Sequence, residues 1–83
     1  MLSILYTAVM DPNVNVQNKV RIRRAELEFT QGELAAKVGC TRQTIAFIEK
    51  GEFMPSITLA LKLAAALSTS IEKLFWLAKK ENS

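Results

Sequence analysis

Arg42 and Gln43 are neighbouring side chains that can each form two parallel hydrogen bonds to one planar partner. The guanidinium of Arg42 matches O6 and N7 of guanine, and the amide of Gln43 matches N6 and N7 of adenine. Thr44 follows with a methyl group and a hydroxyl, while Ala46 and Phe47 add apolar surface of the kind that contacts thymine methyl groups. The chemistry of these side chains is therefore compatible with the recognition of base edges.

The rest of the composition offers few groups for catalysis or metal binding. The chain has 83 residues, no His and one Cys, Cys40. These counts exclude Cys/His zinc sites, Ser-His-Asp triads and Cys-His nucleophile pairs. We therefore expect no enzyme activity, no cofactor and no metal. A single Cys cannot form a disulfide within the chain, which favours a cytoplasmic protein.

The charge is modest and unevenly distributed. The net charge is +3, from 11 basic and 8 acidic residues. Residues 1–17 contain one charged side chain, Asp11, so every basic residue lies in 18–83. A small basic domain without catalytic groups is typical of a binding protein, with nucleic acid as the leading partner.

The spacing of apolar residues predicts five short helices joined by short turns from residue 18 onward. Such a chain forms an all-α domain with one core. The predicted helices cover residues 18–27, 31–38, 42–50, 57–67 and 71 to about 80.

The second and third predicted helices are joined by a tight turn. Thr30 and Glu33 form a capping box that starts the second helix, and Gly39 can adopt the left-handed conformation that ends it. Thr41 then caps the third helix. A connection this short forces the helices to cross steeply, as in a helix-turn-helix, and the small side chain of Ala35 lets them approach.

The chain resembles the Cro/Xre-like helix-turn-helix family, which includes the lambdoid phage repressors. The resemblance covers residues 18–75 and rests on the runs TQGELAAKVG (30–39), TRQTI (41–45), IEKG (48–51), PSITLALKLA (55–64) and SIEKLF (70–75). It implies a compact five-helix lambda-repressor-like domain that binds double-stranded DNA, usually as a homodimer. Helix 42–50 would then read an operator half-site in the major groove.

The resemblance and the chemistry of the side chains together suggest further roles. Phosphate contacts are expected to flank the third helix, from Gln31, Thr41, Lys50, Arg21 and Lys37. For the basic first helix, a merely solvated face is the alternative. The resemblance also implies a buried ion pair between Arg24 and Glu49, which would tie the first helix to the third.

Two positions depart from the family pattern. Glu28 stands where the family often has Gly for a left-handed turn, so the sequence implies either a non-Gly residue at positive φ or a different turn. Phe47 stands where the family often has a polar residue. It could contact thymine methyl groups, or it could pack against the loop 51–54.

The end of the fifth predicted helix suggests a subunit interface. In a helix, Phe75 and Trp76 would point about 100° apart, so both cannot enter one small core. We expect a two-fold dimer through this helix, with its interface formed by Leu74, Phe75, Trp76 and Leu77. The two recognition helices would then lie about 34 Å apart, one turn of DNA.

The N-terminal segment, residues 1–17, allows three interpretations. It could be a disordered or adventitious extension, upstream of a start at Met10. It could instead supply a β-strand to a dimer, because Ile4, Leu5, Tyr6, Thr7 and Val9 favour strands. A membrane or secretion role is the third, although the apolar run is shorter than the roughly 20 residues of a membrane span.

Three functions are compatible with these features. The first is a transcriptional regulator, in particular a repressor, that binds an operator as a dimer. The second is the antitoxin of a toxin–antitoxin pair, which would bind a protein partner as well as DNA. The third is a helical protein-interaction module that does not read DNA, against which the Arg42-Gln43 pair and Gln31 argue.

Overall fold

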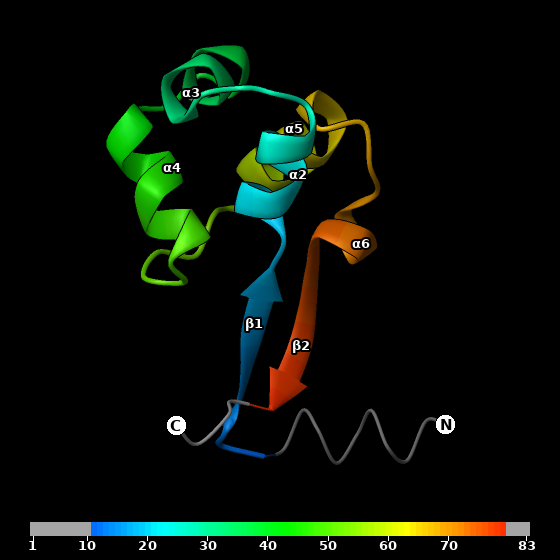
Figure 1. Ribbon diagram of the computed structural model, residues 1–83. Helices are drawn as coiled ribbons and strands as arrows, with labels where there is room; N and C mark the ends of the chain where they lie inside the picture. The colour runs from blue at the N-terminus through cyan, green and yellow to red at the C-terminus, as the bar shows by residue number, and fades with distance from the viewer. Residues whose placement is uncertain (1–10, 80–83) are drawn as a thin grey trace.

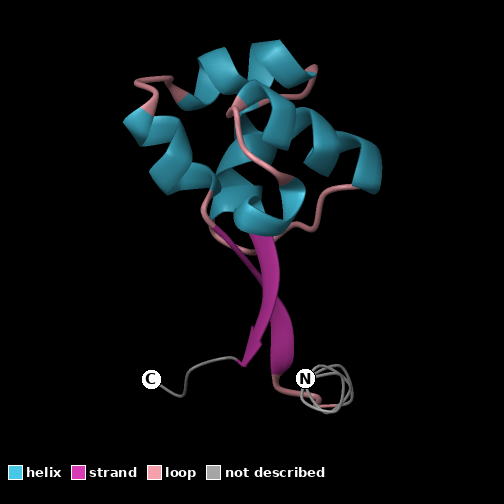
Figure 2. Ribbon diagram, turned by 90° about the vertical axis from the view of Figure 1, so that its right-hand side faces the viewer, coloured by secondary structure: helices cyan, strands magenta, loops and turns pink. Residues whose placement is uncertain are grey.

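The computed structural model describes residues 11–79 and consists of a helical body and a two-stranded β-ribbon that projects from it (Figures 1 and 2). The ribbon is formed by the two ends of the described chain, and the helices lie between them in sequence. The elements are β1 (Val14–Asn18), α2 (Val20–Glu26), α3 (Gln31–Val38), α4 (Arg42–Glu49), α5 (Ile57–Ala66), α6 (Ile71–Leu74) and β2 (Phe75–Lys79).

The core lies inside the helical body. Each helix contributes at least one buried aliphatic side chain, and the largest fully buried ones are Val20, Leu34, Ile45, Ile48, Leu63, Leu67 and Leu74. Small residues on α3 and α5, Ala35 and Ala64, are buried among them and let the helices approach closely. In the described part of the chain, no helix is long and apolar enough to cross a membrane.

The prediction of an all-α domain was wrong in one region. The last helix, α6, ends at Leu74, and the next five residues form β2 where a continued helix was expected. Phe75 already has extended backbone angles, φ −131° and ψ 139°. The physical reason is pairing with the other end of the chain, because β1 and β2 form an antiparallel ladder from Asn18↔Phe75 to Val14↔Lys79.

The same pairing moves the start of the first helix. Asn18, the first residue of the predicted helix 18–27, is the last residue of β1, and α2 begins at Val20. The predicted extension of the domain covers residues 1–17. The strand β1 includes residues on both sides of that boundary, so the last part of the predicted extension belongs to the folded domain. The strand candidates Ile4, Leu5, Tyr6, Thr7 and Val9 lie outside the described residues.

Two helices end on a non-glycine residue in the left-handed region. Glu28 has φ 61° at the end of α2, and Ser68 has φ 53° after α5. At Glu28 the backbone closes as a Schellman motif, with Phe29 N–H bonded to Arg24 C=O and Glu28 N–H bonded to Ala25 C=O. Of the two alternatives for position 28, the structure has the non-glycine residue at positive φ.

We predict that Glu28→Gly stabilises the protein. A residue with a Cβ loses roughly 1 kcal/mol in this conformation, and Gly does not. The free energy of unfolding, measured by urea denaturation, should therefore rise by up to about 1 kcal/mol. Ala25→Gly, three residues earlier within α2, is the matched control and should lose about 1 kcal/mol. Similar losses at both positions would contradict the prediction.

Candidate nucleic-acid interface

The turn between α3 and α4 is built from three local devices. Thr30 Oγ1 accepts from Glu33 N–H at 3.0 Å, and Glu33 Oε1 accepts from Thr30 N–H at 2.8 Å, which completes the capping box of α3. Gly39 ends α3 at φ 77°. Thr41 then caps α4 by accepting from Thr44 N–H at 3.1 Å. The predicted caps and the left-handed Gly39 are all confirmed, and they start α4 three residues after Gly39.

The α4 helix buries one side and presents the other to solvent. Ile45 and Ile48 are fully buried beneath it. On the opposite side, Arg42, Ala46 and Lys50 follow one another at i, i+4, i+8, and Gln43 and Phe47 form the adjacent row. Arg42, Gln43, Lys50 and Phe47 are exposed, and Ala46 is half-buried. All five predicted base-reading residues and Lys50 therefore belong to this helix or its last turn, as Figure 1 shows for α4 at the edge of the body.

Phe47 remains 41% exposed to solvent. The loop that follows α4 is bonded to the backbone of this residue, because Glu52 N–H donates to Phe47 C=O at 2.9 Å. Thr44 is half-buried, and its hydroxyl lies 2.9 Å from that of Thr41. The Thr44 hydroxyl is thus engaged within the N-terminal cap, which leaves its methyl group for outside contacts.

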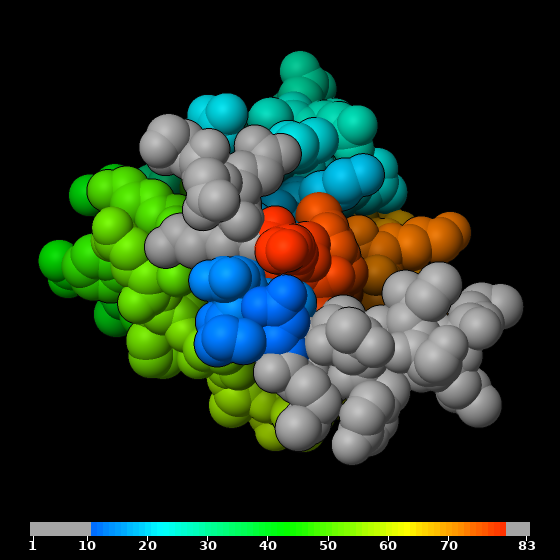
Figure 3. All heavy atoms as spheres, turned by 90° about the horizontal axis from the view of Figure 1, so that it is seen from below, coloured from blue at the N-terminus to red at the C-terminus, as the bar shows by residue number. Residues whose placement is uncertain are grey.

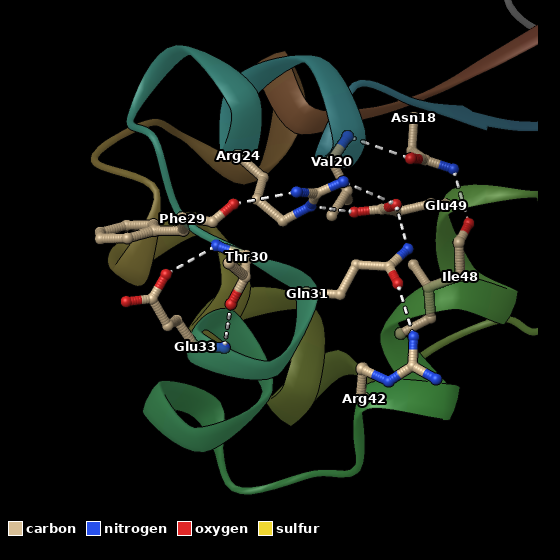
Figure 4. A network of polar contacts seen from close by, with 10 residues as sticks. All are labelled: Asn18, Val20, Arg24, Phe29, Thr30, Gln31, Glu33, Arg42, Ile48 and Glu49. Carbon is tan, nitrogen blue, oxygen red and sulfur yellow. Dashed lines mark hydrogen bonds and ion pairs between the residues drawn. The ribbon is translucent and has the colours of Figure 1, made fainter.

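The first turns of α3 and α4 are joined by side chains. Arg42 Nη1 donates to Gln31 Oε1 at 3.3 Å, so the first residues of the two helices are in contact (Figure 4). The first backbone N–H groups of a helix have no acceptor within that helix, and at both starts they add to the positive end of the helix dipole. Gln31, Thr41 and Arg42 therefore surround two helix N-termini of the kind that binds anions.

Arg24 and Glu49 form the ion pair that the resemblance implies. Arg24 Nε lies 2.6 Å from Glu49 Oε2, and the two side chains are 16% and 3% exposed. Glu49 Oε1 also accepts from Gln31 Nε2 at 3.0 Å, and Arg24 Nη1 donates to Phe29 C=O at 2.9 Å. Figure 4 shows the resulting chain of contacts from Arg24 through Glu49 and Gln31 to Arg42.

The remaining cations have different surroundings. Arg21 is exposed on α2, and the ammonium of exposed Lys37 lies 4.9 Å from the centre of the Phe29 ring. The role of Arg23 in the fold was not revealed by the sequence: its side chain donates to Leu67 C=O at 2.8 Å and to Ser68 C=O at 3.3 Å. It therefore satisfies carbonyl groups at the end of α5, which an arginine near a helix C-terminus commonly does.

Asn18 is a second residue whose role the sequence did not reveal. Its Nδ2 donates to Ile48 C=O at 2.9 Å, and its Oδ1 accepts from Val20 N–H at 3.0 Å. The available signal was an Asn two residues before an apolar helix face, which is typical of a helix start. Its contact with Ile48, thirty residues away in the chain, had no local signal.

The predicted dimer residues are not on one helix. Leu74 is fully buried in the core of its own chain, so it cannot lie in an exposed interface. Phe75, Trp76 and Leu77 lie in β2, where successive side chains point to opposite faces. Phe75 packs against the core, Trp76 lies beside Gln17 with Lys19 Nζ 5.7 Å from its ring, and Leu77 is 50% exposed.

Two titratable groups near the turn are shifted. Hydrogen bonds from the backbone and the hydroxyl of Thr30 lower the pKa of Glu33, so the capping box holds an ionised carboxylate. Burial raises the pKa of the Cys40 thiol. Because the thiolate is the reactive form, this position in the turn makes Cys40 a poor nucleophile.

We predict that Glu49→Gln lowers the free energy of unfolding by about 3–5 kcal/mol, because it leaves the Arg24 guanidinium buried without its counter-ion. The double variant Arg24→Met, Glu49→Leu should lose much less free energy of unfolding than the sum of the losses in the single variants Arg24→Met and Glu49→Leu. Glu26→Gln is the control, because it breaks the exposed Arg23–Glu26 pair and should cost at most about 1 kcal/mol. Urea denaturation measures all of these values, and additive losses from Arg24 and Glu49 would contradict the coupling.

Comparison with known proteins gives consistent matches. The family model described as Helix-turn-helix matches residues 20–74. An uncharacterized HTH-type transcriptional regulator of Bacillus subtilis, YgzD, is 46% identical over 65 residues, which are 78% of this chain and 98% of that protein. One from Methanothermobacter thermautotrophicus is 51% identical over 57 residues, 68% of this chain and 83% of its own. A third, MJ0272 of Methanocaldococcus jannaschii, is 45% identical over 60 residues, 72% of this chain and 91% of its own.

Proposed function

The chain belongs to the Cro/Xre-like helix-turn-helix family, and from this premise we propose that it is a sequence-specific DNA-binding regulator of transcription. Membership of this family makes it a binding protein and not an enzyme. The observation that carries the proposal is the exposed side of α4. Arg42 and Gln43 lie exposed at the N-terminal end of this helix, and Ile45 and Ile48 on its opposite side are buried in the core. A repressor acts most simply with such a domain, by occupying an operator.

The proposed base contacts follow the two exposed rows of α4. Arg42 forms the bidentate contact to guanine, and Gln43 the contact to adenine, since both lie in the first turn of the helix that enters the major groove. Further along, Ala46 and Phe47 provide apolar surface for thymine methyl groups, and the methyl group of Thr44 adds to it. The exposure of Phe47 supports this role over burial against the loop 51–54.

The proposed phosphate contacts lie on both sides of α4. Gln31 and Thr41 stand at the two helix N-termini, where backbone N–H groups and side chains can bind one phosphate together. Lys50 stands beyond the other end of α4, and Arg21 and Lys37 are exposed cations on α2 and α3. These contacts position the helix and carry no sequence information of their own.

Arg42→Ala and Lys50→Ala should weaken DNA binding in different ways. Arg42→Ala removes a base contact, so it should cost about 1–3 kcal/mol on the best site and relax one base position. Lys50→Ala removes a phosphate contact, so it should weaken binding evenly across sequences. The slope of the logarithm of the binding constant against the logarithm of the salt concentration should become shallower by about 1.

Selection of sites from a random DNA pool, followed by fluorescence anisotropy titration at several salt concentrations, measures both effects. Lys62→Ala, on α5, is the control for loss of one positive charge. Enrichment of no sequence by the wild type, or equal affinity of Arg42→Ala and wild type for every sequence, would refute base recognition by α4.

We also propose that the regulator is a homodimer that pairs through its β-ribbon. A two-stranded ribbon is marginal by itself, and each of its strands has one edge without a partner strand in the described chain. On one face of the ribbon, Val16 and Leu77 lie opposite each other. A shallow, mainly apolar hollow of about 280 Å³ lies beside them, and it is lined by Val16, Leu77, Ile71, Phe75, Trp76 and the acidic Glu72. We call the five apolar residues of this lining the ribbon patch.

A second copy fits the ribbon patch better than a ligand does. A two-fold interface uses the same surface on both chains, and apolar and aromatic residues such as those of the patch are typical of interface centres. The patch extends from α6 along the ribbon, and in the view along the ribbon in Figure 3 the described parts of the two strands lie in the middle of the face. A dimer built here holds both α4 helices to one rigid centre, as binding to two half-sites about 34 Å apart requires.

Leu77→Glu should convert the dimer into a monomer, because it places two like charges in a two-fold interface. Sedimentation equilibrium should show the change in mass, and binding to a two-fold-related DNA site should fall more than binding to a single half-site. Ile57→Glu is the control, since Ile57 is 77% exposed on α5, outside the ribbon patch. If Ile57→Glu alone yields the monomer, the dimer forms through α5 and the ribbon proposal is wrong.

A further inference from the structure

One side chain forms a hydrogen bond between the ribbon and the last turn of α4. The two strands pack mainly on each other and on α6, whereas α4 packs on α3 and α2. At the base of the ribbon, Asn18 Nδ2 donates to the carbonyl of Ile48, in the last turn of α4, at 2.9 Å. Among the hydrogen bonds within residues 11–79, this one joins β1 directly to α4.

The same amide also fixes the start of α2. Asn18 Oδ1 accepts from Val20 N–H at 3.0 Å, and the intervening residue, Lys19, donates its N–H to Leu74 C=O at 3.0 Å. A single residue, Lys19, therefore connects β1 to α2, and hydrogen bonds fix the backbone at Lys19 itself and at the following residue, Val20. One partly buried amide holds the end of the ribbon, the start of α2 and the end of α4 in a fixed arrangement, as Figure 4 shows beside Glu49.

The bonding pattern requires an amide. The group toward Ile48 must be a donor, because it meets a carbonyl oxygen, and the group toward Val20 must be an acceptor. Asn provides one of each on a planar group, whereas the carboxylate of an Asp has acceptors only. Asp at this position would keep the bond to Val20 and place a negative oxygen against the Ile48 carbonyl.

We propose that Asn18 is a positioning residue that sets the angle between the ribbon and α4, and thereby the half-site spacing that the dimer accepts. This inference rests on the proposed dimeric DNA binding. Arg42 lies six residues from Ile48, roughly 9 Å along the helix, so a tilt of roughly 10° at the Ile48 end moves Arg42 by about 1.5 Å. In a two-fold dimer the tilt acts on both helices, and the displacement doubles.

The spacing of half-sites is sensitive to changes of this size. One additional base pair moves a half-site by about 3.4 Å along the axis and rotates it by about 35° around it. A dimer with a fixed angle at Asn18 therefore binds one spacing well and the neighbouring spacings poorly. Loss of the Asn18–Ile48 bond should let the ribbon tilt relative to α4, so that the dimer adapts to more than one spacing.

The test compares wild type, Asn18→Asp and Asn18→Ala on DNA containing two selected half-sites at the best spacing and at one base pair more or less. Binding of each protein to DNA with a single half-site is also measured, and sedimentation equilibrium gives the mass of each protein. Wild type should prefer its best spacing, and the two variants should lose roughly five- to tenfold of that preference, the worth of about one hydrogen bond. Their affinity for a single half-site should change less than about threefold, and their mass should remain that of a dimer.

Asn15→Ala is the matched control, because exposed Asn15 lies in the same strand and its side chain accepts a bond from the nearby, half-buried Gln17. It should keep the wild-type spacing preference. Two results would overturn the inference: full spacing preference in Asn18→Asp, or an equal loss of affinity for the single half-site and for all spacings, as general destabilisation of the domain would give. If wild type itself binds no sequence preferentially or shows no spacing preference, the proposed dimeric function fails first and the inference fails with it.

Discussion

The buried carboxylate of Glu49 is the constraint on which the arrangement of the first three helices depends. Its side chain is only 3% exposed, and an ionised group in such a place is tolerated only when it is paired and fully hydrogen-bonded. Arg24 from α2 and Gln31 from α3 supply the donors. Because Glu49 itself ends α4, satisfying one charge brings three helices to fixed positions.

The consequences of that pair reach the surface. Gln31 is held by Glu49 through its amide nitrogen, and its amide oxygen accepts from Arg42. An exposed arginine therefore lies at the end of a chain of contacts that begins with a buried one. Arg24 also donates to Phe29 C=O, in the turn where Glu28 adopts its left-handed conformation. The guanidinium of Arg24 thus stabilises the strained turn at Glu28, and through Glu49 and Gln31 it is also linked to exposed Arg42.

What the sequence predicts well here is what depends on near neighbours. The capping box of Thr30 and Glu33, the cap at Thr41 and the left-handed Gly39 each involve residues within three or four positions, and the turn between α3 and α4 follows from them. The Arg24–Glu49 pair spans 25 positions, and it was anticipated only because the chain resembles a known family. For residues that make local contacts, the physical chemistry of the segment was sufficient.

The error at the C-terminal end has the opposite origin. Phe75 and Trp76 are compatible with a helix and favour a strand, and the segment alone does not decide between them. The partner that decides is β1, whose Asn18 pairs with Phe75 across almost the whole described chain. The same long-range pairing placed Asn18 in a strand when its local signal suggested a helix. Propensity is a weak guide wherever a second strand is far away in sequence.

The proposed dimer would also link DNA binding to the state of the ribbon. Within residues 11–79 the chain has a single hydrophobic core, and the exposed side of α4 and the ribbon patch involve different residues of the surface around it. If operator binding needs two linked copies, occupancy depends on the protein concentration and on anything that covers the ribbon patch, because an event at the interface acts on DNA affinity by mass action. In such a dimer, the contacts at the base of the ribbon, such as the bond from Asn18 to Ile48, would transmit a change at the interface to α4.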